Sequence, residues 1–338
     1  MEREPEELQF LGFFGTCNEA YNLIISCRNL FSKITATLIL PLSFIFLAHI
    51  LISDMIFTNI HMNVYVMEGT PNGSTAKRLI MSRLSTEWTA YFLFKAVYLI
   101  AVLVFSLLST SAVVYTVACV YTSKDVSFGK ILTVVPKVWK RLMVTFLWSF
   151  AILFVYNLSF LLLIIAILLV VDISLTVVLL TALLTLTYLS GMVYISIVWH
   201  LASVVSVVED SYGIAAMRKS KSLIRGKEWT VATIFIVVQF HLAGVELAFG
   251  NRVVRGGDMD VGVRLGFGAV ITVMLTLVVL VALVVQTVVY FVCKSYHHES
   301  IDKSSLANHL EVYLEEYTPL TDKDVQLQQI HVISSGQV

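Results

Sequence analysis

Six long apolar runs, separated by short polar segments, are the feature that most limits what this chain can fold into. They cover residues 34–57, 88–119, 142–171, 173–205, 229–249 and 263–293. A bilayer core about 30 Å thick needs about 20 apolar residues per helix, and each run is long enough. Only 14% of the residues are charged, against about 25% in soluble domains. The sequence therefore predicts an all-α polytopic membrane helix bundle, with six transmembrane helices and cytosolic interfacial helices.

The stretch from 142 to 205 is the one place where the number of spans is open to argument. Its two runs meet at Asp172 without a glycine or proline. Three spans in this stretch would move the basic segment 207–228 to the other side of the membrane, against the preference of Lys and Arg for cytosolic connections. Two spans joined as a hairpin are therefore predicted.

The distribution of Lys and Arg residues predicts the orientation. The side of the termini carries sixteen of them: three in 1–33, five in 122–141, five in 207–228 and three from 294 onward. The opposite side carries six. Because cytosolic connections are enriched in Lys and Arg, both termini are expected in the cytosol, in a protein of the endoplasmic reticulum, the endomembrane system or the plasma membrane. Asn72, in the acceptor sequence "NGS", then falls in a lumenal loop, and we expect it to be glycosylated.

Three regions follow from this layout. Residues 1–33 form a cytosolic amphipathic segment, residues 34–293 the six-span domain, and residues 294–338 a cytosolic tail. Apolar residues recur at helical spacing over 304–317 and predict one amphipathic helix in the tail. That helix either docks beneath the membrane domain or binds a protein partner.

The connector "VVEDSYGIAAMRKSKSLIRGKEW" (207–229) reads as an interfacial helix. Such a helix can lie in the headgroup layer with its cations near anionic lipid, or it can pack against neighbouring helix ends. The residues assigned to lipid headgroups are Arg218, Lys219, Lys221, Arg225 and Lys227. The segment "DVSFGKILTVVPKVWKRL" (125–142) is similar, and the N-terminal segment more loosely so. The chain therefore reads as three units, each with an interfacial helix followed by a two-span hairpin.

Polar residues within the spans are few, and such residues are functional candidates in a membrane. The four singled out are Lys95, Gln239, Glu246 and Asp54; His49, His200 and His241 also lie within spans. We expect Lys95 to pair with Glu246 or Asp54, because pairing offsets part of the cost of burying a charge. The alternative is that Lys95 extends to the lumenal headgroups.

The cysteines all fall on or near the predicted cytosolic face, where disulfides are disfavoured. Cys293 stands beside Lys294 at a membrane boundary, a setting that suits S-acylation. The alternative interpretation is an ordinary buried or interfacial thiol.

Several motifs resemble those of known families. The segment 207–229, together with "LPLSF" (40–44), "CKSYHHES" (293–300) and "LEVYLEEYTPL" (310–320), resembles a plant family of six-span membrane proteins without an assigned biochemical activity. More distantly, the order of residues in 207–229 is similar to the bacterial glycerophosphodiester phosphodiesterase membrane-domain family. That resemblance implies a membrane module, separate from the catalytic barrel, and it transfers no catalytic residue.

No motif for catalysis, metal binding or cofactor binding stands out. The sequence lacks a nucleophile elbow, a His-Glu-x-x-His motif and a phosphate-binding glycine loop. No cofactor and no nucleic acid are expected. The predicted function is that of a non-enzymatic membrane protein that acts through lipid and protein contacts on its cytosolic face, in a scaffolding, membrane-organising or trafficking role. The alternative is a transporter or channel subunit that uses polar residues of the second and fifth spans.

Overall fold

The computed structural model describes residues 5–71, 73–122, 128–170, 174–257 and 259–298, and the described residues form helices with no strand among them. Six helical stretches are long and apolar enough to cross a membrane. This confirms the predicted six-span, all-α class. In chain order the elements are η1 (Pro5–Phe10), α1 (Phe13–Ser26), α2 (Arg28–Ile34), η2 (Thr35–Ile39), α3 (Leu40–Glu68), α4 (Thr75–Tyr121), α5 (Phe128–Val170), α6 (Leu175–Val208), α7 (Ile214–Ile224), α8 (Glu228–Phe249), η3 (Gly250–Val254) and α9 (Val261–Tyr296).

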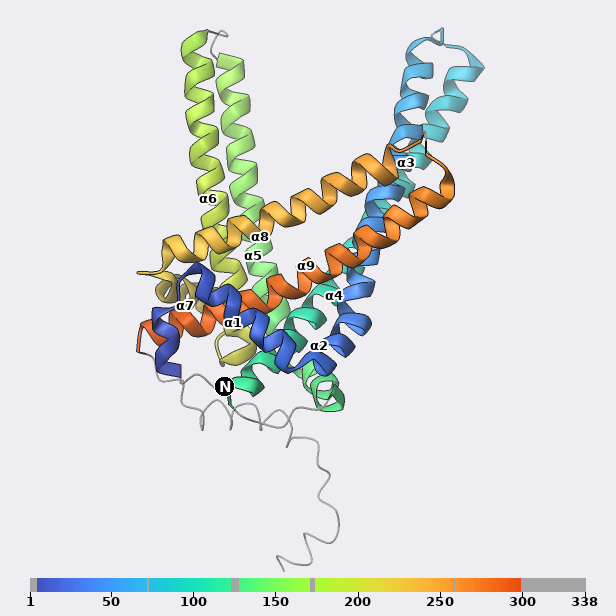
Figure 1. Cartoon of the computed structure of the whole chain (residues 1–338). Coiled ribbons are helices and arrows are strands. Elements are labelled where there is room, and N and C mark those ends of the chain that lie inside the picture. The colour runs from blue at the N-terminus through green and yellow to red at the C-terminus, as the bar shows by residue number, and fades with distance from the viewer. Residues whose placement is uncertain (1–4, 72, 123–127, 171–173, 258, 299–338) are drawn as a thin grey trace, which may run out of the picture.

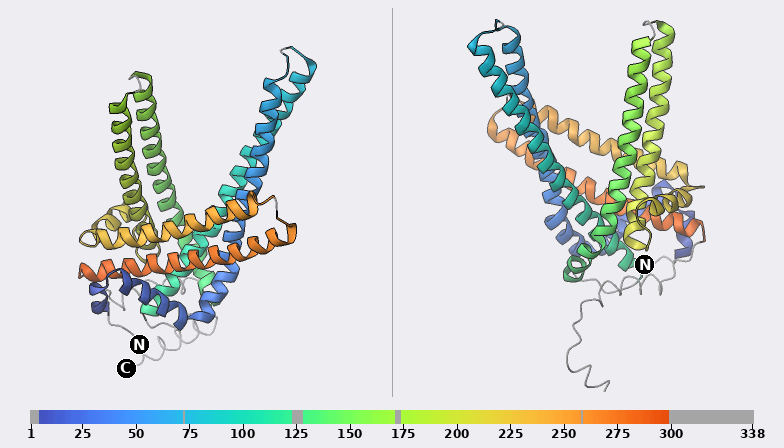
Figure 2. Two further views of the ribbon diagram at one scale, coloured as in Figure 1. Left: turned by 45° about the horizontal axis from the view of Figure 1, so that its top comes forward. Right: turned by 180° about the vertical axis from the view of Figure 1, so that it is seen from behind.

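The six long helices pair as three hairpins, α3–α4, α5–α6 and α8–α9 (Figure 1). The α3–α4 and α5–α6 hairpins diverge from a shared base, and α8 and α9 run obliquely past both (Figure 2). Helix α6 begins at Leu175, where the Ser174 side chain accepts a hydrogen bond from the Val177 amide. Residues 142–206 thus contribute two helices, α5 and α6, as predicted.

In the part of the chain that the structure describes, the larger of two buried clusters lies at one end of the molecule, and a smaller one joins α3, α8, η3 and α9. Fully buried side chains gather in the last turns of α4, α6 and α9, where Ala112–Cys119, Leu201–Val208 and Val284–Cys293 face one another and the N-terminal helices. The opposite halves of α5 and α6 are largely exposed. Since these halves are apolar, they are surfaces for lipid.

Helices α3 and α4 extend further than the apolar runs predicted. Helix α4 has 47 residues, which is about 70 Å by helical rise, against a bilayer core of about 30 Å. In the extension the amide of Asn63 donates to both carboxylate oxygens of Glu87 at 2.8 Å. Polar contacts of this kind let a helical hairpin continue into water.

The prediction of a separate interfacial helix before the third span is wrong. The segment from 128 onward is the first part of α5, continuous with its span, and Pro136 lies inside the helix. A proline removes one backbone hydrogen bond and can kink a helix without ending it. The connector before α8 does form a separate helix, α7, because Gly226 adopts φ +86° after it. In the N-terminal segment α1 is a separate helix, whereas α2 continues through η2 into α3 and belongs to the first span.

Candidate functional site

The connection between α6 and α7 places one acidic side chain at the core end of the bundle. Helix α6 ends at Val208, and Glu209 follows with an extended backbone (φ −124°, ψ 165°). The chain turns at Gly213, whose φ of +63° suits glycine. The Gly213 amide donates to Oγ1 of Thr145 on α5 at 2.7 Å, which fixes the turn on the neighbouring helix.

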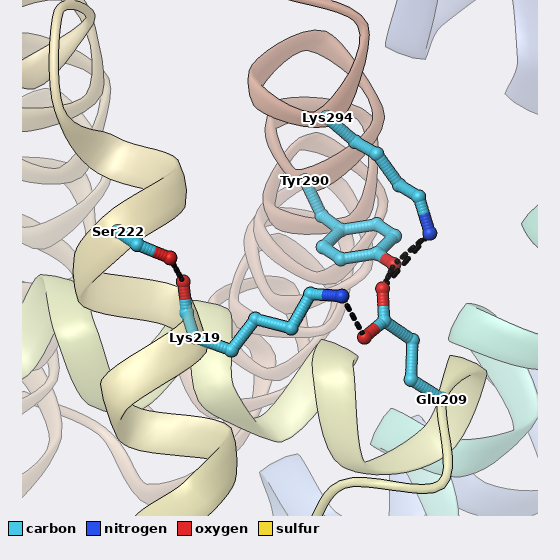
Figure 3. A network of polar contacts seen from close by, with 5 residues as sticks. All are labelled: Glu209, Lys219, Ser222, Tyr290 and Lys294. Carbon is cyan, nitrogen blue, oxygen red and sulfur yellow. Dashed lines mark hydrogen bonds and ion pairs between the residues drawn. The ribbon is translucent and has the colours of Figure 1, made fainter. Parts of the chain in front are cut away.

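Glu209 is the centre of a four-residue polar cluster, the Glu209 cluster, which comprises Glu209, Lys219, Tyr290 and Lys294 (Figure 3). Oε2 of Glu209 lies 2.7 Å from Nζ of Lys219 on α7, and Oε1 lies 2.9 Å from Nζ of Lys294 on α9. The Tyr290 hydroxyl donates to the same Oε1 at 2.5 Å. One carboxylate therefore joins the C-terminal ends of α6 and α9 to the middle of α7.

Most of the Glu209 cluster is shielded from water. The side chains of Glu209 and Lys294 are 13% and 16% exposed, and that of Lys219 is 31% exposed. Burial by itself raises the pKa of the Glu209 carboxyl, but the hydrogen bonds from Lys219, Tyr290 and Lys294 outweigh burial and hold the pKa below its ordinary value. Glu209 is therefore ionised at neutral pH, and the cluster carries two ammonium groups against one carboxylate.

A second set of contacts fastens the α7–α8 turn to the end of α9. Nε2 of His297 lies 3.1 Å from the Leu223 carbonyl oxygen and 3.0 Å from that of Arg225, so it donates to the C-terminal end of α7. Nζ of Lys227 lies 5.3 Å from the centre of the Tyr296 ring. It also donates to the carbonyl oxygen of Leu11 at 3.2 Å, which ties in the N-terminal segment.

The five cations predicted to contact lipid headgroups divide into two groups. Lys219 and Lys227 face inward, where they bind Glu209 and the Leu11 carbonyl. Arg218, Lys221 and Arg225 are exposed on the outer face of α7. The spacing of three residues puts Arg218 and Lys221 on one face of the helix, and Arg225 follows directly after its last residue. The opposite face of α7 is buried, at Ala216, Met217, Ser220, Leu223 and Ile224.

The Glu209 cluster was not predicted, because Lys219 was assigned to the lipid headgroups and Glu209 was given no partner. Glu209 and Lys294 both stand at the predicted cytosolic ends of apolar helices, so they share a depth in the membrane. Opposite charges at one depth of a bundle are candidates for pairing. That signal was available in the sequence.

The prediction that Lys95 pairs with Glu246 or Asp54 is wrong. Nζ of Lys95 on α4 donates to Nε2 of His49 on α3 at 2.7 Å, and among the described residues no ion pair joins it to a carboxylate. The His49 ring also stacks on Tyr98 at 3.5 Å between centroids. The partner is His49 because it lies on the α4-facing side of α3, whereas five residues at about 100° each turn Asp54 to another side, where it is exposed.

The remaining predicted residues lie in separate places. Glu246 is exposed on α8, and Gln239, also exposed, lines a cavity between α6, α8 and α9. Cys293 is 0% exposed within the core, which contradicts S-acylation because an acyl chain cannot be accommodated there. Its thiol is a packed core group. Asn72 and the tail segment 304–317 lie outside the described residues, so the glycosylation site and the tail helix stay predictions.

Among the described residues, no group of three or more His, Cys, Asp or Glu side chains gathers where it could hold a metal ion. The six apolar helices and the clustered charges at their core end define an integral, multi-pass membrane protein.

Residues 1–330 match the family described as a domain of unknown function, DUF8558, and the chain belongs to that family. No curated protein and no solved structure matches the chain. The comparisons thus name neither of the two families that the motifs resemble, and those resemblances stay expectations.

Proposed function

We propose that the protein is a non-enzymatic membrane protein that binds anionic phospholipid at its cytosolic face through α7, in a scaffolding or membrane-organising role. The observation that carries the proposal is the division of the α7 cations. Two of them hold the helix to the bundle, and Arg218, Lys221 and Arg225 remain exposed on its outer face. Among the described residues these three side chains have no ion-pair partner.

The location of α7 favours lipid as the ligand of these cations. The excess of Lys and Arg assigns this end of the bundle to the cytosol, and the cytosolic leaflet carries the anionic lipids. Trp229, in the first turn of α8, is 87% exposed, and exposed tryptophans of membrane proteins gather at the headgroup level. Because α7 is held in the headgroup layer by its contacts with the bundle, little further conformational entropy is lost when its cations bind lipid.

The N-terminal helices add an apolar contact at the same end of the molecule. Helix α1 buries Thr16, Ala20 and Leu23 against the bundle and leaves Phe14, Tyr21 and Ile25 exposed by 84%, 62% and 51%. An interfacial helix with outward aromatic side chains can insert them between headgroups and acyl chains. The pair of helices would then combine apolar insertion by α1 with charge attraction by α7.

Neutralising the exposed cations tests the proposal. The variant Arg218→Ser/Lys221→Ser/Arg225→Ser in mixed nanodiscs should lose preference for spin-labelled phosphatidylserine over phosphatidylcholine. The loss should be on the order of fivefold per cation, because each one near an anionic surface contributes about 1 kcal/mol. The charge-preserving variant Arg218→Lys/Lys221→Arg/Arg225→Lys is the matched control and should keep the preference. Equal preference in the two variants would show that α7 is a packing element only.

The proposed orientation has its own test. In sealed microsomes with the cytosolic face outward, both termini should be accessible to protease. Asn72→Gln should abolish a mobility shift that is sensitive to endoglycosidase. Glycosylation of a reporter fused after Val338 would place the tail in the lumen and overturn the orientation.

A transporter or channel subunit is the second function that the sequence suggested, and the positions of the polar side chains favour it less. Lys95 is bound to His49 between α3 and α4, whereas Gln239 lines a cavity among α6, α8 and α9. The two side chains therefore lie at different helix contacts. Solute uptake or ion current in vesicles reconstituted with the protein would support the transport function.

A further inference from the structure

An apolar cavity of about 190 Å³ lies between α6, α8 and α9. Its walls are mostly aliphatic, with Ile197 and Leu201 from α6, Val231 and Ile234 from α8, and Val285 among those from α9. The volume exceeds the roughly 150 Å³ of an engineered apolar cavity that stays dry and binds benzene. All three helices are candidate membrane spans. Lipid molecules of the bilayer are therefore the ligands that can reach the cavity.

Three polar side chains line the cavity: His200 and Gln286 contact each other, and Gln239 is exposed where the cavity meets the surface. Nε2 of Gln286 donates to the His200 carbonyl oxygen at 2.6 Å and to Oγ of Ser203 at 2.8 Å. Oε1 of Gln286 lies 3.3 Å from Nδ1 of His200. Because these groups satisfy each other, a polar ligand would gain little in the cavity, and an apolar one would lose little. The lining therefore selects a hydrocarbon.

The cavity is elongated along α8. Along α8 its lining runs from Val231 to Leu242, which is about 16 Å by helical rise. A second hollow of about 260 Å³ lies towards α1 and shares Ile234, Val238 and Val285 with the first. Gln239 lines the cavity and is exposed, so the cavity reaches the molecular surface. An extended chain suits this form better than a compact ring.

The cytosolic end of the cavity lies near the α7–α8 turn, which carries the exposed Arg225. Val231 lines the cavity and comes six residues after Arg225, with the exposed Trp229 between them. The α7–α8 turn is held there by His297 and by the packing of Gly226 on Tyr296. A ligand with a hydrocarbon chain in the cavity would thus have its polar end beside positive charge.

We propose that this cavity holds one acyl chain of an anionic phospholipid, with the headgroup against the exposed cations of α7. The inference rests on the proposed lipid binding and deepens it, from a charged surface to a site for a single lipid. An acyl chain matches the apolar lining and the length, and the anionic headgroup matches the charge at the mouth.

Photo-crosslinking of the full-length protein in nanodiscs tests the site. The probes are phosphatidylserine and phosphatidylcholine that carry a diazirine on the acyl chain, and the labelled peptides are located by mass spectrometry. Phosphatidylserine should label peptides of α6, α8 and α9 that line the cavity. Ala282→Trp should abolish this labelling, because Ala282 lines the cavity and the indole would fill it. Ala282→Leu, which adds fewer atoms, should reduce the labelling in part.

Ala269→Trp is the matched control. Ala269 lies on the same helix, is exposed and does not line the cavity, so labelling should persist. Unchanged labelling in a folded Ala282→Trp or Ala282→Leu protein would overturn the acyl-chain site and leave the surface attraction of α7 intact. Equal cavity labelling by the two lipids would overturn the assignment of an anionic headgroup. Loss of phosphatidylserine preference in both charge variants of α7 would instead count against the proposed function.

Discussion

Replacement of Glu209 with alanine should lower the free energy of unfolding by about 3 kcal/mol, the usual cost of removing one partner from a largely buried ion pair. The substitution leaves the ammonium groups of Lys219 and Lys294 without their carboxylate, and the hydroxyl of Tyr290 without its acceptor. Most of this loss comes from Lys294, whose side chain is 16% exposed and stays largely buried. Lys219 is 31% exposed, so water can solvate its ammonium group. Thermal unfolding of the purified protein in detergent measures the effect.

Asp210→Ala is the matched control, one residue along the chain. Asp210 pairs with Arg141 at 2.7 Å, but these side chains are 73% and 33% exposed. An exposed pair contributes about 0–1 kcal/mol, so this variant should unfold close to the unmodified protein. Adding Lys294→Met to Glu209→Ala should restore part of the stability, because it removes the buried, unpaired ammonium. Equal destabilisation by Glu209→Ala and Asp210→Ala would rule out a special role for the cluster.

The same cluster predicts a dependence of stability on pH. The pKa of Glu209 in the folded protein lies below its ordinary value of 4.5, which is the value expected in the unfolded chain. The stabilisation by the ionised carboxylate is therefore complete above the unfolded pKa and is lost as the pH falls through the folded pKa. A series of unfolding measurements from neutral to acidic pH should show this loss in the unmodified protein and a smaller one in Glu209→Gln.

Gly226→Ala should be the most damaging small substitution in the α7–α8 connection. Gly226 has φ +86°, a region that side-chain-bearing residues rarely adopt, and a Cβ atom there would lie 2.6 Å from the Tyr296 ring. The backbone strain costs about 1–3 kcal/mol, and displacement of the ring would disturb the contact of Lys227 with it. We expect a lower unfolding temperature together with weaker phosphatidylserine preference, because the turn that orients α7 would shift.

Gly244→Ala provides the comparison. Gly244 lies inside α8, and a Cβ atom there would meet nothing within 4 Å. Alanine is favoured over glycine in a helix by about 1 kcal/mol, so this variant should unfold at the same or a higher temperature. If both glycine variants behaved alike, the positive φ and the ring contact at Gly226 would not be what holds the turn.

The course of α7 was predictable from the sequence in unusual detail. The buried stripe through Ala216, Ser220 and Leu223 and the exposed Arg218 follow from helical periodicity. The end of the helix shortly before Gly226 follows from the freedom of glycine to adopt positive φ. These features depend on residues close together in the chain. The similar segment before the third span lacks a glycine at its end, and it continues into the span as part of α5, with Pro136 inside the helix.

The partners of the charged side chains were not predictable in this way. Lys219 had the same local setting as Lys221, yet one binds Glu209 and the other is exposed. Lys95 bonds to His49, a residue 46 positions away, rather than to either carboxylate proposed for it. A side chain's partner depends on how helices rotate against one another, and a rotation of one residue, about 100°, is enough to change it.

The sequence by itself determined the number of spans, the sides of the membrane that the charges favour and the amphipathic faces, because hydrophobic thickness and helical period act on consecutive residues. Only the tertiary structure decided that Glu209 joins α6, α7 and α9, that Cys293 is buried, and that an apolar cavity remains between α6, α8 and α9. These features arise where helices distant in the chain meet, and the packing of their side chains sets which groups touch and where space is left.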